Sequence, residues 1–187
     1  MTIIATCTLS SLPAEAKRHP GLTAHRLRYC VSIPSLALDP ASFPWTPALF
    51  LPNQPSLPGL PESHAPFHYV TYPRFLPIIS SGDLLFTLRD GKAGLGNDHL
   101  YRYAPSGTGG YKYTYLGQYL TGIWSNPYVN GLDYRDGKIH VTWVWRDWVE
   151  YEGWDDPTDT KHKMQAGPNS VENNRDLCYS WSEDLGR

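Results

Sequence analysis

Residues Phe67–Gly91, FHYVTYPRFLPIISSGDLLFTLRDG, decide the fold class of this chain. Val70–Ile79 is rich in β-branched and aromatic residues, Ser81-Gly82-Asp83 has the composition of a tight turn, and Leu84–Leu88 is a second apolar run. The stretch therefore predicts a β-hairpin. Its second strand carries a charged residue, Arg89, to its end.

A related pattern returns at Val129–Asp147, VNGLDYRDGKIHVTWVWRD. Asp136-Gly137 takes the place of the first turn, and the second strand again finishes in Arg-Asp. Each copy is followed by a further aromatic strand, at His99–Tyr103 and at Asp176–Ser182. A repeat of roughly fifty residues built from antiparallel strands is typical of a β-propeller blade. We therefore expect an all-β chain, an incomplete β-propeller of about two four-stranded antiparallel blades plus an extra strand.

The remaining segments are organised around these repeats, and the partial propeller is expected to span 25–187. Residues 1–24 are a poorly specified lead-in, and His25–Ser32 alternates well enough for one strand, with no strand-like sequence before it to pair with. Residues 33–66 are so rich in proline that they predict a long surface connection. Residues 150–174 are polar and aperiodic, which predicts a loop insertion.

The C-terminal residues Ser182-Glu183-Asp184-Leu185-Gly186 match the opening of an Asp-box, the S-x-D-x-G-x-T-W turn in which the aspartate bonds to the local backbone. A propeller protects its sheet edges by closing into a ring, and two blades with one additional strand are too few to close one. We therefore expect the chain to be a fragment of a larger propeller, truncated at both ends.

Composition narrows the classes of function. The 187 residues are 41% hydrophobic and 13% aromatic, and the net charge is −2. Such a balance gives no electrostatic footprint for nucleic acid or an anionic membrane, and no run approaches the length of a membrane-spanning helix. The first residues lack the positively charged start of a secretory signal. We expect neither a nucleic-acid partner nor a membrane partner.

Six motifs together resemble the BNR-repeat-containing family: HRLRYCVS, VTYPRF, GDLLFTLRDG, NGLDYRDGKIHVTWVWRD, YEGWDDP and NRDLCYSWSEDLG. That family comprises seven-bladed propellers and includes polysaccharide lyases active on ulvan and on rhamnose–glucuronate linkages. The resemblance covers most of residues 25–187. It implies a polysaccharide or oligosaccharide containing uronic acid as the partner, and a full-length parent that is monomeric and extracellular.

Elimination next to a uronic acid requires a group that neutralises the carboxylate, a base and an acid. Arginine grips a carboxylate with two hydrogen bonds, and histidine or tyrosine can transfer protons. By resemblance, His25 and Tyr72 fall at the catalytic positions of the family and Arg89 at its carboxylate-binding arginine. Arg146 occupies the same place one repeat later, and Trp154 in the insertion is a candidate for stacking on sugars.

These residues also have structural alternatives. His25 could be an ordinary strand-end histidine, and Tyr72 could pack on a sheet face. Arg89 could pair with Asp90 or Asp98, and Arg146 could pair with its neighbouring aspartate.

A metal is not expected. Asp155, Asp156 and Asp159 offer oxygen ligands for Ca²⁺, but D-D-P-T-D lacks the spacing and glycine of an EF-hand, so a solvated acidic loop is the preferred interpretation. No other cofactor is indicated.

Three functions remain open at this point. The first is a polysaccharide lyase-like protein, inactive as this chain alone because relatives carry another histidine upstream that has no match here. The second is a glycoside hydrolase of sialidase-like type, which would need two carboxylates flanking the scissile bond. The third is a non-catalytic carbohydrate-binding propeller.

Overall fold

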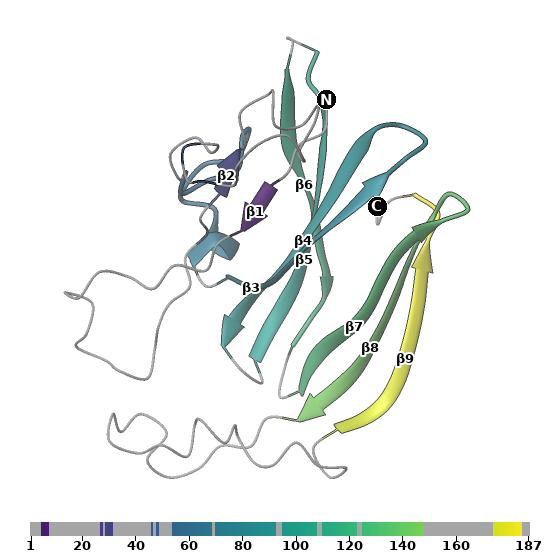
Figure 1. The fold of residues 1–187 in the computed structure, drawn as a ribbon. Helices are drawn as coiled ribbons and strands as arrows, with labels where there is room; N and C mark the ends of the chain where they lie inside the picture. Colours follow the sequence, from purple (N-terminus) through teal and green to yellow (C-terminus); the bar gives the residue numbers. More distant parts are fainter. Residues whose placement is uncertain are drawn as a thin grey trace, which may run out of the picture.

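The computed structural model describes residues 5–7, 27, 29–31, 46, 48, 54–68, 70–92, 95–107, 110–122, 125–147 and 174–184. Their strands form one short two-stranded pair and two larger antiparallel sheets that lie side by side (Figure 1). The all-β class predicted from the sequence is confirmed, as an incomplete propeller-like array of sheets. In the part of the chain that the structure describes, no helix is long and apolar enough to cross a membrane.

The first sheet has the strand order β3-β4-β5-β6. Its strands are β3 (Val70–Ile78), β4 (Asp83–Lys92), β5 (Leu95–Pro105) and β6 (Tyr111–Leu120). The turn between β3 and β4 contains Gly82 at a φ of +75°, a conformation that glycine adopts without steric cost. The predicted hairpin and the two strands that follow it are confirmed.

The second sheet has the order β7-β8-β9. Its strands are β7 (Ser125–Arg135), β8 (Lys138–Asp147) and β9 (Asn174–Ser182). Asp136 and Gly137 have φ values of +53° and +79°, as the two central residues of a type I′ hairpin require. Three strands of this sheet lie within the described residues, where the sequence predicted four.

The two sheets repeat the same strand register. Thr71 of β3 lies opposite Arg89 of β4, and Asn126 of β7 lies opposite Arg146 of β8. We call β3 and β7 the inner strands of the two sheets. In both pairs the register shifts a few residues further along the inner strand, which marks a bulge or irregularity. The repeat read from the sequence is therefore present in the backbone pairing, and it places the two arginines at equivalent positions.

An apolar interface joins the two sheets. Ile78, Leu85 and Leu100 of the first sheet form one buried cluster with Ile139 of the second. Full burial of such a side chain contributes roughly 1.5–3 kcal/mol, so this cluster is sufficient to fix how one sheet packs on the other. The inner strands are also joined directly, because Arg74 Nη2 donates a hydrogen bond of 2.7 Å to the carbonyl oxygen of Val129.

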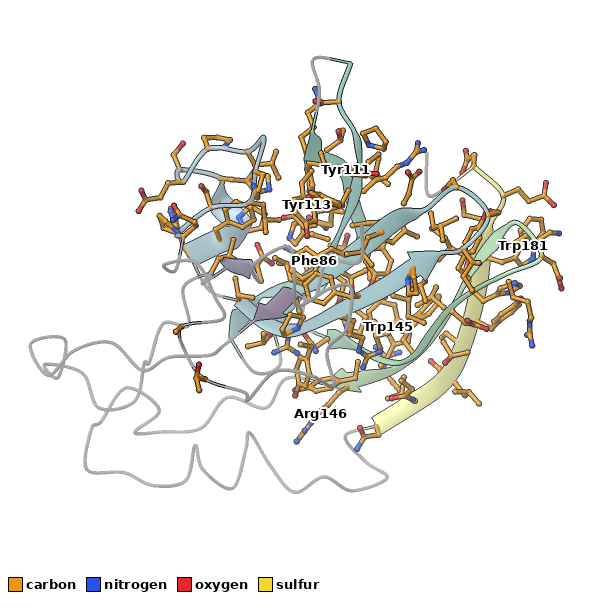
Figure 2. The ribbon with its side chains drawn as sticks, turned by 45° about the horizontal axis from the view of Figure 1, so that its top comes forward. Phe86, Tyr111, Tyr113, Trp145, Arg146 and Trp181 are labelled. Carbon is orange, nitrogen blue, oxygen red and sulfur yellow. The ribbon has the colours of Figure 1, made fainter. Side chains whose placement is uncertain are left out.

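The opposite face of the first sheet is covered by the segment that precedes it. Leu57 and Phe67 are buried against Phe86 and Tyr113, which Figure 2 labels. The segment includes the 3-10 turn η5 (Ala65–His68), and Tyr113 N donates to the carbonyl oxygen of Pro58 at 2.7 Å. The proline-rich connection was expected to run along the surface. Most of its described residues, 54–66, are exposed or half-buried, and Leu57 anchors the segment in the core, because proline prevents strand pairing without preventing apolar packing.

The lead-in also contains a strand that sequence reasoning missed. β1 (Ala5–Cys7) pairs antiparallel with β2 (Tyr29–Val31), with Thr6 opposite Cys30. The expectation that nothing strand-like precedes His25 is therefore wrong. Three residues are too few for the alternation of side chains to show in a sequence.

The C-terminal motif is joined by two local hydrogen bonds between Ser182 and Asp184. The Ser182 hydroxyl donates to Asp184 Oδ1 at 2.6 Å, and the amide of Asp184 donates to Ser182 Oγ at 3.3 Å. The rest of the motif, and residues 148–173 with most of the predicted insertion, lie outside the described residues.

Candidate functional site

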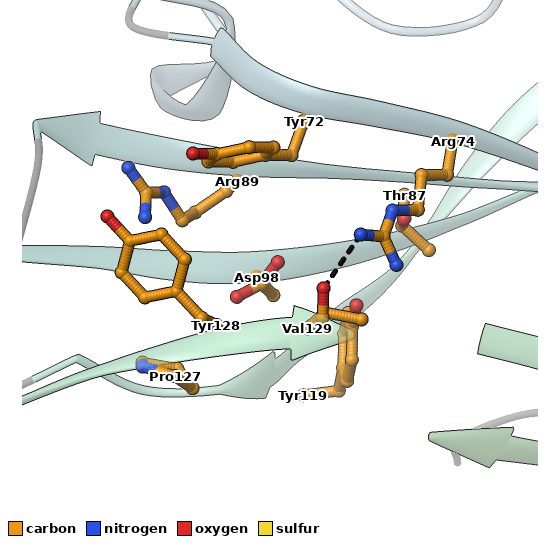
Figure 3. Close-up of a pocket in the computed structure, with 9 residues that line it drawn as sticks. All are labelled: Tyr72, Arg74, Thr87, Arg89, Asp98, Tyr119, Pro127, Tyr128 and Val129. Atoms are coloured by element: carbon orange, nitrogen blue, oxygen red, sulfur yellow. Dashed lines mark hydrogen bonds between the residues drawn. The ribbon is translucent and has the colours of Figure 1, made fainter. Parts of the chain in front are cut away.

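A cleft opens between the two sheets on the face where they meet. It is narrow, with a free volume of about 20 Å³, and every strand from β3 to β7 contributes to its lining. Tyr72, Arg89, Asp98 and Tyr128 are among the side chains that line it (Figure 3). The cleft therefore brings two of the predicted site residues, Tyr72 and Arg89, together.

Arg89 is held at the end of its strand with part of its guanidinium unpaired. The residue is 3% exposed, and its Nε donates a hydrogen bond of 3.1 Å to Thr71 Oγ1. Its Nη1 is buried and has no hydrogen-bond partner among the described residues. A buried cationic donor without a partner is costly, so the site is suited to an anion that would accept this hydrogen bond.

Gly96 of β5 leaves the space that the Arg89 side chain occupies. A Cβ at this position would lie 2.5 Å from the carbonyl oxygen of Asp90 and 3.0 Å from Arg89 Cδ. Any larger residue would therefore displace the arginine or the neighbouring backbone.

Two tyrosine rings contact the Arg89 guanidinium. Its Cζ lies 5.0 Å from the centroid of the Tyr72 ring and 5.1 Å from that of the Tyr128 ring, within the range of cation–π attraction (Figure 3). Tyr72 has a φ of +51°, in the left-handed region, and is 52% exposed. A non-glycine residue held in this region is uncommon and often marks a functional position. Its ring lies edge to face with the Tyr128 ring, with 6.0 Å between the ring centroids.

Arg146, on β8 of the second sheet, also lies near Tyr128. It is buried, its Cζ lies 5.6 Å from the Tyr128 ring centroid, and its Nη2 has no partner in the described part of the chain. The adjacent Ser125 Oγ and Asn126 Oδ1 are likewise buried without partners there. Arg146 is not among the residues lining the cleft, but Tyr128 contacts both arginines.

Asp98 supplies an acidic group to the cleft. It is 5% exposed and lies opposite Arg89 in the pairing of β4 and β5. Burial raises the pKa of its carboxyl to about 7, although the charges of Arg89 and Arg74 act to lower it. This carboxyl is therefore partly protonated at neutral pH.

Asp90, the other acid considered as a partner for Arg89, has a different environment. Its Oδ2 lies 3.2 Å from His99 Nε2, and its Oδ1 accepts a hydrogen bond from the amide of Asn97 at 3.1 Å. Burial alone would raise the pKa of Asp90, but His99 and the Asn97 amide hold it below its usual range. His99 Nδ1 is in turn 2.8 Å from the hydroxyl of Tyr115. Because side chains alternate along β4, Asp90 faces away from the Arg89 cleft.

The other predicted site residues lie outside the described residues. These are His25 and Trp154, together with the acidic loop of Asp155, Asp156 and Asp159. Within the described ranges, no group of three or more histidine, cysteine, aspartate or glutamate side chains could hold a metal ion.

The sequence analysis gave no role to Tyr128, and it considered Asp98 only as a possible ion partner of Arg89. Tyr128 contacts Arg89 because the two sheets pack against each other, and a local sequence pattern does not predict such a contact. Asp98 stands in the polar stretch Gly96-Asn97-Asp98-His99, so no local pattern indicated that it would be buried.

Comparison with known sequences agrees with the repeat architecture. The model of the family described as BNR repeat-containing family members matches residues 20–187, which include both sheets and the cleft. No curated protein matches the chain.

Proposed function

This chain belongs to the BNR repeat-containing family, and on that premise we propose that it is a carbohydrate-active β-propeller protein whose cleft binds the carboxylate of a uronic acid. We propose further that the reaction served by this site is β-elimination, as in polysaccharide lyases. Family membership supports a carbohydrate-related propeller, and the chemistry of the cleft supports the uronate and the elimination.

The buried, partly unpaired guanidinium of Arg89 is the observation that carries the proposal. A uronate carboxylate is an anion of suitable size to accept the hydrogen bond that Nη1 leaves unmade. The rings of Tyr72 and Tyr128 flank the guanidinium and would limit its movement, so that less entropy is lost on binding.

Neutralising the carboxylate makes the hydrogen on the adjacent ring carbon more acidic. A base then removes that proton, the electron pair forms a carbon–carbon double bond, and the glycosidic oxygen on the next carbon leaves with a proton from an acid. Tyr72 is exposed next to Arg89 and is our candidate for proton transfer at this site. The resemblance assigns the second proton-transfer role to His25.

Hydrolysis by a pair of carboxylates fits the cleft less well. Most glycosidases place a carboxylate on each side of the scissile bond, whereas sialidases use a tyrosine nucleophile. Among the described residues that line the cleft, Asp98 is the single carboxyl group, and Asp90 faces the other side of the sheet.

Titration calorimetry with D-glucuronate, using D-glucose as the neutral control, tests the binding step. We expect binding of glucuronate only. Absence of glucuronate binding would contradict the proposal.

Incubation with uronate-containing polysaccharides tests the reaction. Elimination creates a double bond conjugated to the carboxylate, which absorbs in the ultraviolet. New reducing ends without this absorbance would indicate hydrolysis, and binding without any product would indicate a non-catalytic binding propeller.

A further inference from the structure

Asp98 is a buried acid in a cleft that we assign to an acidic ligand. Its Oδ2 has no hydrogen-bond partner among the described residues. Figure 3 shows its side chain in the middle of the cleft, between the end formed by Arg89 and Tyr128 and the end formed by Arg74 and Val129. A carboxyl group that is neither exposed nor fully bonded calls for a chemical explanation.

A purely structural ion pair with Arg89 does not explain this geometry. Arg89 directs its Nε to Thr71 Oγ1, and Arg74 directs its Nη2 to the carbonyl oxygen of Val129. Both arginines therefore have other partners, and Asp98 is left facing the space where a ligand would lie.

We propose that Asp98 is a specificity-determining residue of this site: its protonated carboxyl donates a hydrogen bond to the bound uronate carboxylate, and its ionised form repels that carboxylate and competes for Arg89. The inference rests on the proposed function of the cleft. No bond of the ligand changes: where Asp98 is ionised, its carboxylate takes one proton from solvent, forming an O–H bond, and keeps that proton while the ligand is bound.

The surroundings of Asp98 are suited to such a group. Five other titratable or charged side chains line the cleft with Asp98, and they come from four strands: Tyr72, Arg74, Arg89, Tyr119 and Tyr128. The charge of Asp90 acts on Asp98 from the other face of β4. Burial is the main cause that raises the pKa of Asp98 to about 7, and the two arginines oppose it. A ligand carboxylate placed on Arg89 would cancel part of that opposition and favour the protonated form further.

Binding should therefore weaken as pH rises. If only the protonated form accepts the ligand, the dissociation constant for D-glucuronate rises about tenfold from pH 6 to pH 8 and, at pH 8, about one proton is taken up per glucuronate bound. The carboxyl group of glucuronate is ionised over this whole range, so it contributes nothing to the dependence.

Calorimetric titration of the full chain at pH 6, 7 and 8, in two buffers of different ionisation enthalpy, measures affinity and proton uptake together. We expect Asp98→Asn to bind glucuronate with an affinity that is independent of pH in this range and without proton uptake. Since histidines also titrate in this interval, the difference between wild type and variant is the decisive quantity. The wild-type titration itself needs no variant: glucuronate should bind about tenfold more weakly at pH 8 than at pH 6.

The outcomes separate the two proposals. Glucuronate binding with no pH dependence and no proton uptake in wild type would overturn the role of Asp98 and leave the uronate site standing. Proton uptake that persists unchanged in Asp98→Asn would do the same. Failure of wild type to bind glucuronate at every pH would overturn both.

Discussion

Arg89 and Arg146 occupy the same position in two consecutive sheets but have different surroundings. Each lies near the end of the second strand, opposite a short polar residue of the inner strand, Thr71 or Asn126. Each is buried with one guanidinium nitrogen that has no partner in the described part of the chain. The repeated backbone therefore delivers a buried arginine twice.

The third strand makes the difference. The residue opposite Arg89 on β5 is the acid Asp98, whereas the residue opposite Arg146 on β9 is the neutral amide Asn174. Arg89 also contacts two tyrosine rings and Arg146 only Tyr128, among the rings that the structure describes. The repeated backbone thus sets the position of a charged side chain, and the neighbouring side chains set its electrostatic environment.

The substitution Asp98→Asn places an amide opposite Arg89, like the amide of Asn174 opposite Arg146. In the folded protein the pKa of Asp98 is raised from 3.8 to about 7, so the folded state keeps a proton that the unfolded state releases. The titration of Asp98 therefore lowers the stability of wild type as pH rises from about 4 to about 7, by at most about 4 kcal/mol from this group alone. We expect the stability difference between Asp98→Asn and wild type to grow over this interval and then remain constant.

Urea unfolding at several pH values measures this difference. Asp133→Asn is the matched control, because Asp133 is exposed on β7. If the stability difference between Asp98→Asn and wild type is the same at pH 4 and pH 8, the pKa of Asp98 is not raised in the folded state.

Arg89→Ala should have the largest effect on ligand binding. It removes the hydrogen bonds to the uronate carboxylate, and bonds to charged groups contribute about 1.5–3 kcal/mol, so affinity for D-glucuronate should fall roughly 10- to 100-fold. Arg89→Lys retains the charge without the planar fork and should be intermediate. Calorimetry checks both, with the exposed Arg135→Ala as control. Unchanged binding by Arg89→Ala would remove the basis of the comparison.

Arg146→Ala should weaken glucuronate binding less, by about tenfold or below, because Arg146 does not line the cleft and interacts with the ligand at longer range. The same titration measures this effect. A loss equal to that of Arg89→Ala would mean that the two arginines grip the ligand jointly, and the difference in their surroundings would then not matter for affinity.

Strand-level features were predictable from the sequence and cross-sheet features were not. The hairpin turns at Gly82 and at Asp136-Gly137, and the arginine that closes each second strand, follow from local residue types and a side-chain period of two. The contact between Tyr128 and Arg89 depends on how one sheet packs on the next. The covering of the first sheet by Leu57 likewise depends on tertiary packing, to which a proline-rich composition gives no guide.

Tyr128 contacts both Arg89 and Arg146, and its substitution should have the smallest effect on glucuronate affinity. Tyr128→Leu removes a ring that attracts both guanidinium groups, each contact contributing about 0.5–1 kcal/mol, so glucuronate affinity should fall only a few-fold, while Tyr128→Phe retains the ring and should bind as wild type does. The combination with Arg89→Ala is more informative than either change alone. If Tyr128 acts by positioning Arg89, then Tyr128→Leu should cost little further affinity once Arg89 is absent, and calorimetry of the double variant measures that coupling. An undiminished additional loss would instead mean that Tyr128 acts through Arg146 or contacts the sugar itself, and the two arginines would then share a single site.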